Sequence, residues 1–342
     1  MSITLHDVAR VAGVSIKTVS NVIHDYPHIR PATRQRVEEA IVELGYTPNL
    51  TARNLRSGRT GAIALAVPDL SLSYFAELAG FVIQEAEKAG VVVLVEQTGA
   101  DRRRELDLLR SPRLKLTDGM IFSPLGMGQE DLEALRVPYP LVILGERIFD
   151  GPVDHVTMRN VEGARAATEY LLASGRRRIA VVGAHRGEVI GSAGLRLRGY
   201  QEALLDAGIP VDETIIGYMR DWHRANGALA MRQLIDSGAE FDAVFGLNDT
   251  LALGAMRVLQ EAGLRVPHDV AVIGWDDIDE AQYSIPSLTT VDPGSAWIAR
   301  TAVHTLLDRV AHADRRDPPT LHLSDFRVVA RESAPVAYPT VT

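Results

Sequence analysis

Residues 4–24 read TLHDVARVAGVSIKTVSNVIH, with one glycine between two short runs of helical apolar spacing. Thr4 can cap a first helix, and Asp7 stands near the positive end of its dipole. Gly13 can end that helix because glycine takes a positive φ without strain. The apolar side chains of the helix recur on one face, at Leu5, Val8, Ala9 and Ala12.

The second half of this stretch predicts another helix, over residues 16–24, which Ser15 can cap. Its apolar stripe consists of Val19, Val22 and Ile23. Its other face presents Ile16, Lys17, Thr18, Ser20 and Asn21. Two short helices joined by a glycine-containing turn are typical of a helix-turn-helix, whose second helix lies in the DNA major groove. The alternative is a helical hairpin with a solvated face.

Two side chains on that face have the chemistry of base readout. Lys17 can donate to guanine O6 and N7, and Asn21 can pair with adenine N6 and N7. A third helix follows, with Pro31 in its first turn and Gly45 at its end. The sequence therefore predicts an all-α helix-turn-helix domain over residues 1–48.

The charge distribution supports contact with phosphate at this end of the chain. Residues 1–60 hold eight Lys and Arg against five Asp and Glu, a net charge of +3, whereas the whole chain carries −8. The remaining 282 residues therefore carry −11. Hydrophobic residues make up 46% and charged residues 23%, which predicts packed globular domains. The chain has no cysteine, which excludes disulfides and thiolate metal sites, and we expect no metal or cofactor.

From residue 62 onward, short β-branched runs alternate with amphipathic helices. Continuous apolar strands interleaved with helices predict parallel sheets that are covered on both faces. The series divides near Asn160 into two similar halves, which predicts two doubly wound lobes, as in periplasmic sugar-binding proteins. Eight strands are expected, at residues 63–67, 91–96, 119–122, 141–144, 179–182, 215–218, 243–246 and 270–275.

Polar and aromatic side chains follow several of these strands. Because ligands of doubly wound sheets bind outside the carboxyl ends of the strands, we expect these side chains to line one cleft. Aromatic rings can stack on a pyranose, while arginine, asparagine and aspartate bind its hydroxyl groups. The candidate ligand-binding residues are Asp69, Leu72, Tyr74, Phe75, Arg196, Trp222, Asn248 and Asp276.

Simpler structural roles are open to residues in the same loops. Arg196 and Asp276 could pair with each other across the lobes. Asp249 is expected to cap a helix, Trp275 to lie in the core, and Asp277 to cap the next turn.

The quoted residues resemble the lac-repressor/gal-repressor (LacI/GalR) family. The signature consists of residues 4–15, Thr18-Val19-Ser20 and Gly45-Tyr46-Thr47-Pro48-Asn49. The resemblance continues to about Ser333 and so covers nearly the whole chain. It implies a sequence-specific DNA-binding transcriptional regulator, a repressor, whose operator affinity is controlled by a small-molecule effector such as a sugar.

The resemblance also implies that residues 49–60 are a hinge helix and linker that order on operator DNA. Ala52 and Arg53 would lie at the minor groove, and Leu55 would be the apolar wedge at the centre of the site. Many members have arginine where this chain has Asn21, which leaves the preferred base open. The implied DNA-binding residues are Thr4, Ser15, Ile16, Lys17, Thr18, Ser20, Asn21, Asn49, Ala52, Arg53 and Leu55.

In the sensor, residues 61–333, family positions match Arg196, Trp222, Asn248 and Asp276 as effector contacts. Arg159, Pro293 and Asp69 depart from the family pattern, which leaves a purine or another non-sugar metabolite open as effector. The resemblance places crossovers between the lobes near Asn160 and near residues 286–292 and 318–321. The implied parts are lobe one at residues 61–160 and 292–318, lobe two at residues 161–288 and 319–333, and a tail at residues 334–342.

The family mechanism implies a homodimer on a pseudo-palindromic operator, with one helix-turn-helix per half-site. No heptad extension follows Ser333, which favours a dimer over a tetramer built by a coiled coil. Effector binding would rotate the lobes and change the order of the two hinges. Whether the effector releases or recruits DNA is open.

Two other classes of protein could share such lobes. A transporter's solute-binding protein is disfavoured by the basic N-terminal domain and because residues 1–10 show no signal-peptide pattern. An α/β sugar-modifying enzyme is disfavoured because no nucleophile elbow, phosphate-binding loop or metal-ligand cluster occurs, and because His185 and His223 stand alone. No apolar run reaches ~18 residues, so a cytoplasmic location without membrane contact is expected.

Overall fold

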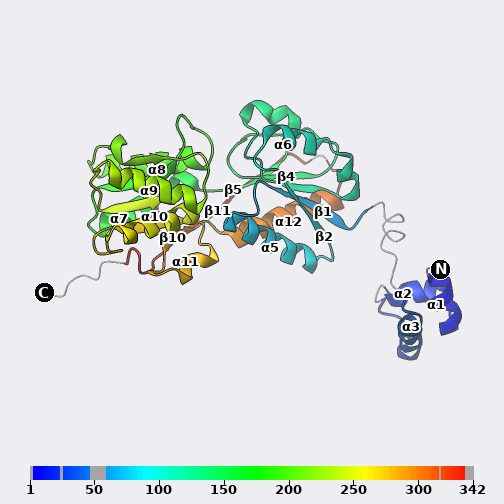
Figure 1. Ribbon diagram of the computed structural model, residues 1–342. Coiled ribbons are helices and arrows are strands. Elements are labelled where there is room, and N and C mark those ends of the chain that lie inside the picture. The colour runs from blue at the N-terminus through cyan, green and yellow to red at the C-terminus, as the bar shows by residue number, and fades with distance from the viewer. Residues whose placement is uncertain (1–2, 24–25, 47–58, 316, 336–342) are drawn as a thin grey trace. The chain divides into compact units, whose positions relative to one another are not determined.

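The computed structural model describes residues 3–23, 26–46, 59–315 and 317–335 (Figure 1). They belong to two compact units, residues 1–60 and residues 61–342. The expected hinge contacts Asn49, Ala52, Arg53 and Leu55 lie outside the described residues. Among the helices of the described ranges, none is long and apolar enough to cross a membrane.

The first unit is helical, as predicted, with α1 (Leu5–Ala12), α2 (Ile16–Ile23) and α3 (Pro31–Leu44). The Asp7 carboxylate accepts hydrogen bonds from the Thr4 backbone N–H at 3.0 Å and from the Thr4 hydroxyl at 2.7 Å. These bonds lower the pKa of Asp7 below its usual value and fix the start of α1. Gly13 ends α1 with a φ of +65°, as predicted.

The second helix begins at its predicted cap. The Ser15 hydroxyl oxygen accepts a hydrogen bond from the backbone N–H of Thr18 at 3.1 Å. The three helices enclose a small apolar core of Val8, Ala9, Ala12, Val19, Val22, Val37, Ala40 and Tyr46. Local capping and this core together explain why so short a segment folds as a unit.

The second unit consists of two lobes, each built on a six-stranded sheet (Figure 1). In lobe one the strand order is β11-β5-β4-β3-β1-β2, and the pairs are parallel. The strands are β1 (Ala62–Val67), β2 (Val92–Gln97), β3 (Met120–Phe122), β4 (Leu141–Leu144), β5 (Asp154–Met158) and β11 (Leu321–Ser324). The helices are α5 (Ser73–Lys88), α6 (Arg102–Leu109) and α12 (Ser295–Ala311), with the 3-10 turns η1 (Pro112–Leu116) and η2 (Gln129–Leu135).

Lobe two repeats this plan with the strand order β12-β10-β9-β8-β6-β7. Its pairs are parallel except that β12 runs antiparallel to β10. The strands are β6 (Ile179–Ala184), β7 (Ile216–Tyr218), β8 (Ala243–Gly246), β9 (Ala271–Trp275), β10 (Thr289–Asp292) and β12 (Arg327–Val329). The helices are α7 (Asn160–Ala173), α8 (Ser192–Asp206), α9 (Arg224–Asp236), α10 (Asp249–Glu261) and α11 (Asp279–Tyr283), with the 3-10 turn η3 (Glu213–Ile215).

The fold class predicted from the sequence is confirmed, but the third crossover is not where it was expected. The chain passes between the lobes after β5, after β10 and after β11. The third passage lies at residues 325–326, because β11 pairs with β5 from Leu321 opposite His155 to Ser324 opposite Met158. Residues 319–324 therefore belong to lobe one, and the prediction that assigned them to lobe two is wrong.

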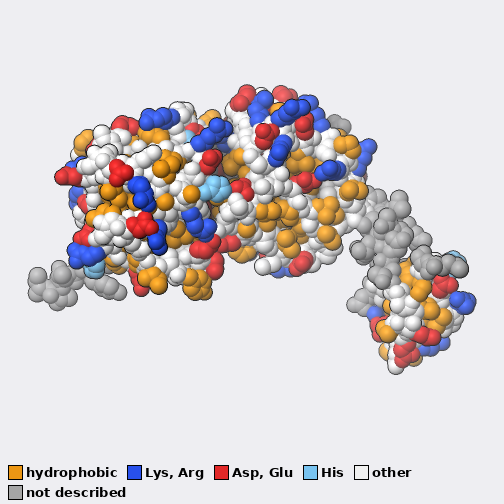
Figure 2. Space-filling model, viewed as in Figure 1, with side chains coloured by type: hydrophobic (Ala, Val, Ile, Leu, Met, Phe, Trp, Pro, Cys, Tyr) orange, Lys and Arg blue, Asp and Glu red, His pale blue; other side chains and the backbone are white. Residues whose placement is uncertain are grey.

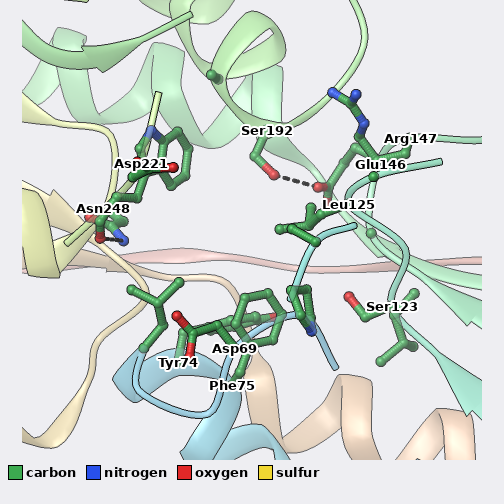
Figure 3. A pocket seen from close by; sticks show the side chains of 18 of the residues that line it. Asp69, Tyr74, Phe75, Ser123, Leu125, Glu146, Arg147, Ser192, Asp221 and Asn248 are labelled. Atoms are coloured by element: carbon green, nitrogen blue, oxygen red, sulfur yellow. Dashed lines mark hydrogen bonds between the residues drawn. The ribbon is translucent and has the colours of Figure 1, made fainter. Parts of the chain in front are cut away.

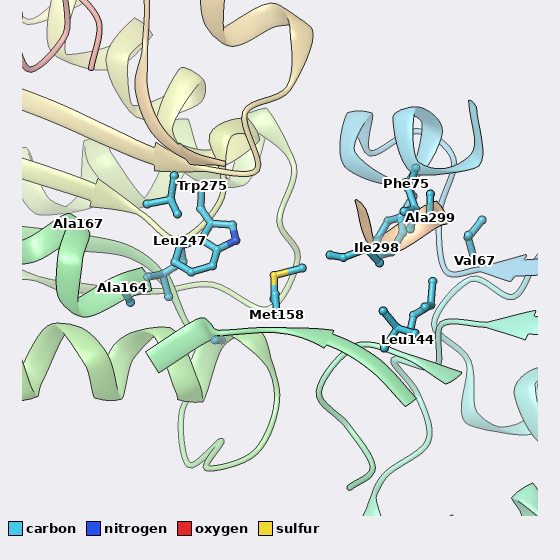
Figure 4. Close-up of a cluster of buried hydrophobic side chains, with 14 of the residues drawn as sticks. Val67, Phe75, Leu144, Met158, Ala164, Ala167, Leu247, Trp275, Ile298 and Ala299 are labelled. Carbon is cyan, nitrogen blue, oxygen red and sulfur yellow. The ribbon is translucent and has the colours of Figure 1, made fainter. Parts of the chain in front are cut away.

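One cluster of buried apolar side chains extends through both lobes. In Figure 4, Trp275 and Leu247 lie on the lobe-two side, Phe75 and Ile298 lie on the lobe-one side, and Met158 lies between them. Trp275 is fully buried, as predicted. The ends of the strands are thus fixed in a continuous core, and the loops that follow them are positioned by it.

Candidate functional site

A cavity of about 720 Å³ lies between the two lobes. The loops after several strands of both sheets contribute to its lining (Figure 3). The structure brings all of the predicted ligand-binding residues to this cavity: Asp69, Leu72, Tyr74, Phe75, Arg196, Trp222, Asn248 and Asp276. The rule that ligands bind at the carboxyl ends of doubly wound sheets therefore located the cavity.

Arg196, on α8, is fixed on several sides and only 3% exposed. Its Nε donates to Asn160 Oδ1 at 2.8 Å, and its Nη1 donates to the backbone oxygen of Leu247. Its guanidinium carbon lies 4.2 Å from the ring centre of Trp275 and 5.4 Å from that of Trp222. Burial lowers the pKa of Arg196, and the nearby charge of Asp276 opposes that change. The site thus holds a rigid, largely desolvated cation.

Asp276 follows β9 and is only 8% exposed. Its backbone N–H donates to the oxygen of Val291 at 2.9 Å. Within the described ranges no residue donates a hydrogen bond to its carboxylate, so the direct pairing with Arg196 that the sequence left open is not formed. Burial raises the pKa of Asp276 well above its usual value, and the charge of Arg196 opposes this shift.

Asn248, and not Asp249, caps α10. Asn248 Oδ1 accepts from the backbone N–H of Leu251 at 2.7 Å, and its Nδ2 donates to the oxygen of Trp222 at 3.4 Å. The prediction that Asp249 caps this helix is therefore wrong. Asp249 is fully buried, and its carboxylate accepts from the Thr290 hydroxyl at 2.6 Å and from Ile278 N–H at 3.0 Å. Burial raises the pKa of Asp249 to about 7.

Three aromatic side chains form apolar walls. The Trp222 indole Nε1 donates to the oxygen of Gly183 at 2.8 Å, which orients the ring. The rings of Tyr74 and Phe75 meet edge to face with their centres 5.0 Å apart. Burial, together with the charges of Asp276 and Glu146, raises the pKa of Tyr74, so its phenol stays neutral and can donate.

The sequence reasoning missed a group of charged residues that joins the lobes. Glu146 accepts from Ser192 Oγ of lobe two at 2.6 Å (Figure 3) and from Thr157 Oγ1 at 3.1 Å. Arg147 forms an ion pair with Glu188 of lobe two at 3.0 Å. Both Glu146 and Arg147 follow the predicted strand at residues 141–144, so the strand-end rule would have found them.

Three further residues differ from their predicted roles. His185 Nδ1 lies 2.8 Å from Glu188 Oε2, and His223 Nε2 lies 3.5 Å from Asp69 Oδ2, so neither histidine stands alone. Both line the cavity. Asp277 caps no turn but forms an ion pair with Arg331 at 2.6 Å. The partners of His223 and Asp277 are distant in sequence, and the partner of His185 lies in the same loop. Sequence spacing predicts contacts within helices and strands, so it could not predict these pairs.

In the helical unit, the predicted DNA-contacting face of α2 is accessible. Lys17 is exposed, as are Thr4 and Ser15 at the helix starts, and Thr18, Ser20 and Asn21 are partly exposed. Ile16 is half-buried and packs against the core of the three helices, so only part of its side chain can reach a ligand.

Two family models match the chain. The model for bacterial regulatory proteins of the lacI family matches residues 4–49, and the model for a periplasmic binding protein-like domain matches residues 168–334. Among curated proteins, the HTH-type transcriptional regulator CelR of Thermobifida fusca is 37% identical over an alignment of 345 positions, which covers 96% of this chain and 98% of that protein.

Solved structures of regulators share the whole architecture. The complex of the transcriptional regulator CelR with cellobiose matches at a TM-score of 0.71 and 32% identity, over 97% of this chain and 99% of that chain. The lac repressor dimer bound to operator and the anti-inducer ONPF matches at a TM-score of 0.80 and 28% identity, over 98% of this chain and all of that chain. The similarity therefore extends through the helix-turn-helix and both lobes, and the chain belongs to the LacI family of bacterial transcriptional regulators.

Proposed function

We propose that this regulator represses from a specific operator and that a sugar bound between the lobes controls its affinity for that operator. The observation that carries the proposal is the carboxyl group of Asp276, which has no hydrogen-bond donor among the described residues. Its carboxylate lines the cavity and lies near the fixed guanidinium of Arg196. A ligand with several hydroxyl groups would satisfy both side chains at once.

The lining of the cavity favours a carbohydrate. Tyr74, Phe75 and Trp222 offer ring faces and edges to the apolar surface of a pyranose. The cavity volume of about 720 Å³ lies in the range of ~300–1,000 Å³ that is usual for small-molecule sites, and it admits a disaccharide as well as a monosaccharide. The similarity to a regulator solved with cellobiose makes cellobiose the first probe to test.

Contacts between the lobes could couple ligand binding to the affinity for DNA. Lobe one reaches lobe two through the Arg147–Glu188 ion pair and the Glu146–Ser192 hydrogen bond, and also through Ser73, whose hydroxyl donates to Glu280 at 2.7 Å. A ligand that touches both lobes would favour one arrangement of these contacts over another. Coupling free energies of ~1–3 kcal/mol are usual for such linkage.

We further propose a homodimer. The edge strand β2 exposes apolar side chains at Val92, Leu94 and Val95, and Tyr283 and Ile285 are exposed on lobe two. Figure 2 shows hydrophobic side chains on the face of lobe one over the region where α5 and β2 lie. A second copy of the chain is the occupant that fits, because the lac repressor, which has the same architecture, is a dimer.

The first experiment is selection of bound sequences from random duplex DNA by the purified full chain at a stated salt concentration. We expect a single palindromic motif with a central pyrimidine–purine step. The Asn21→Ala variant should select the same motif with one base position relaxed in each half-site. Failure to enrich any motif, with and without a mixture of metabolites, would contradict the proposed DNA readout.

Operator affinity is then measured with cellobiose, ribose, other mono- and disaccharides, and purine bases. We expect one sugar to change the affinity ~5–150-fold, the range usual for allosteric coupling. Asp276→Asn should remove this response, whereas Asp236→Asn, at an exposed position of α9, should retain it. A response to a purine base and to no sugar would show that the proposed ligand class is wrong.

A further inference from the structure

The backbone that carries Asp276 is unusual. Asp276 has a φ of +118° and Asp277 a φ of +54°, so two consecutive non-glycine residues lie at positive φ. Residues with a side chain rarely adopt such angles, and they do so only where the surrounding structure imposes them. The turn at residues 276–278 must therefore be held from outside.

Three contacts hold this turn, one at each residue. The Asp276 N–H donates to the oxygen of Val291 on β10 at 2.9 Å. The Ile278 N–H donates to the buried carboxylate of Asp249 at 3.0 Å. Between them, the Asp277 carboxylate accepts from Arg331 Nη2 at 2.6 Å. The first two contacts fix backbone atoms, whereas the third fixes the turn through a side chain.

Arg331 is itself firmly placed. It follows β12, soon after the last passage of the chain from lobe one. Its Nη1 donates to the oxygen of Leu288 at 2.9 Å, and its backbone N–H donates to the Thr289 hydroxyl at 2.9 Å. The side chains of Arg331 and Asp277 are 17% and 18% exposed, so water screens their ion pair only weakly.

We infer that Arg331 is a positioning residue for the ligand site: by holding Asp277, it maintains the backbone that directs Asp276 to the cavity. Arg331 does not line the cavity, so a ligand bound there would not touch it directly. The inference rests on the proposed function, because it gives Arg331 a role in that site. A purely structural role, in which Arg331 only fastens the end of the chain to β10, is the competing explanation.

The first test needs no ligand. Amide hydrogen exchange at residues 276–278 is measured in the full chain for the wild type, Arg331→Gln and Asp277→Asn. We expect both variants to exchange at least tenfold faster there, because each removes the same ion pair. Asp277→Asn leaves every backbone contact of Arg331 in place, so it remains informative if Arg331→Gln folds poorly.

The matched control is Arg327→Gln. It makes the same substitution, on β12, and removes an ion pair with Asp292 at 2.9 Å, but it removes none of the three contacts that hold the turn. It should leave exchange at residues 276–278 unchanged. Exchange at wild-type rates in both Arg331→Gln and Asp277→Asn would overturn the inference.

The second test uses cellobiose as the probe, or the responding sugar from the panel above. Arg331→Gln should weaken binding of this probe ~10–100-fold, and Asp276→Asn should also weaken it. The double variant should bind no more weakly than Asp276→Asn alone, because Arg331 acts through Asp276. Effects that multiply would show an independent role and refute the inference. If the wild type binds no sugar, the proposed ligand class fails, while the exchange measurement still decides the role of Arg331.

Discussion

Three buried carboxylates show how the partners of a residue determine what it can do. Glu105, on α6, is fully buried and accepts backbone hydrogen bonds from Leu125, Gly126 and Met127 at 2.7–3.0 Å. It thereby holds the loop that carries Leu125 and Gly126 to the cavity. Asp249 has two hydrogen-bond donors, whereas Asp276 has none among the described side chains. Glu105 and Asp249 are committed to the fold, and Asp276 remains available to a ligand.

Asp249 gives a pH-dependent contribution to stability. Burial raises its pKa from the ordinary 3.8 to about 7, so the folded chain retains this proton where the unfolded chain has lost it. The free energy of unfolding should therefore fall as the pH rises from about 4 to about 7, with a slope approaching ~1.4 kcal/mol per pH unit from this group. Asp249→Asn should remove that slope. Urea unfolding of both proteins across this range measures the difference, and parallel pH profiles would contradict the assignment.

The helical elements pack closely where glycine allows it. On α9 and α10, a Cβ added to Gly254 would lie 2.0 Å from the backbone oxygen of Arg224, and one added to Gly227 would lie 2.2 Å from that of Leu251. The two helices thus bring their backbones together at a pair of reciprocal glycines. This packing fixes the frame from which Asn248 and Trp222 reach the cavity.

We expect Gly254→Ala to lower the free energy of unfolding by ~1–3 kcal/mol, because the methyl group has only backbone atoms to displace. Gly80 on α5 is the control, since nothing lies within 4 Å of an added Cβ there. Gly80→Ala should raise stability by up to ~1 kcal/mol through the higher helix propensity of alanine. Thermal unfolding compares the two, and equal effects would contradict the packing argument.

The helices and strands that the sequence predicted are those marked by nearby residues, such as caps, glycine stops and apolar runs. The helix-turn-helix was found from Thr4, Gly13 and Ser15, and the eight apolar strands were found with ends within two residues. Strands β5, β10, β11 and β12 were not predicted. Strand β5 was missed because it buries polar side chains whose partners are remote, such as Asp154, which binds Arg309 at 2.7 Å. The contacts of His155 and Thr157 in the fold are equally invisible in a pattern of apolar spacing.

The residues of the candidate site likewise fall into those that local signals predict and those that only the assembled fold reveals. The strand-end rule and the family resemblance together brought eight side chains to one cavity. Glu146 follows the strand at residues 141–144 and so obeys the same rule, whereas no spacing rule reveals that Asp277 pairs with Arg331 across 54 residues. Pairings of this kind are set by the packing of the lobes and appear only once the sheets are assembled.

At the scale of the whole molecule, the proposed dimer can be tested on β2. Val92 is 56% exposed on this edge strand, and Val92→Lys would place a charge in the proposed interface. We expect dissociation to monomers in sedimentation and at least tenfold weaker operator binding, because one half-site contact is lost. Val189→Lys puts the same charge on an exposed valine of a lobe-two loop and should leave the assembly intact. An intact Val92→Lys dimer would exclude this face.

The late pairing of β11 with β5 has a consequence for how the protein is made. Residues 154–158 leave the ribosome well before residues 321–324, and at ~5–20 residues per second the delay is on the order of 10 s. Throughout that interval the nascent first lobe has an open edge. Asp154, His155 and Thr157 on that strand make it a poor template for another apolar strand. We therefore expect the polar residues that interrupt the apolar pattern of β5 to limit the pairing of this edge with other chains during synthesis.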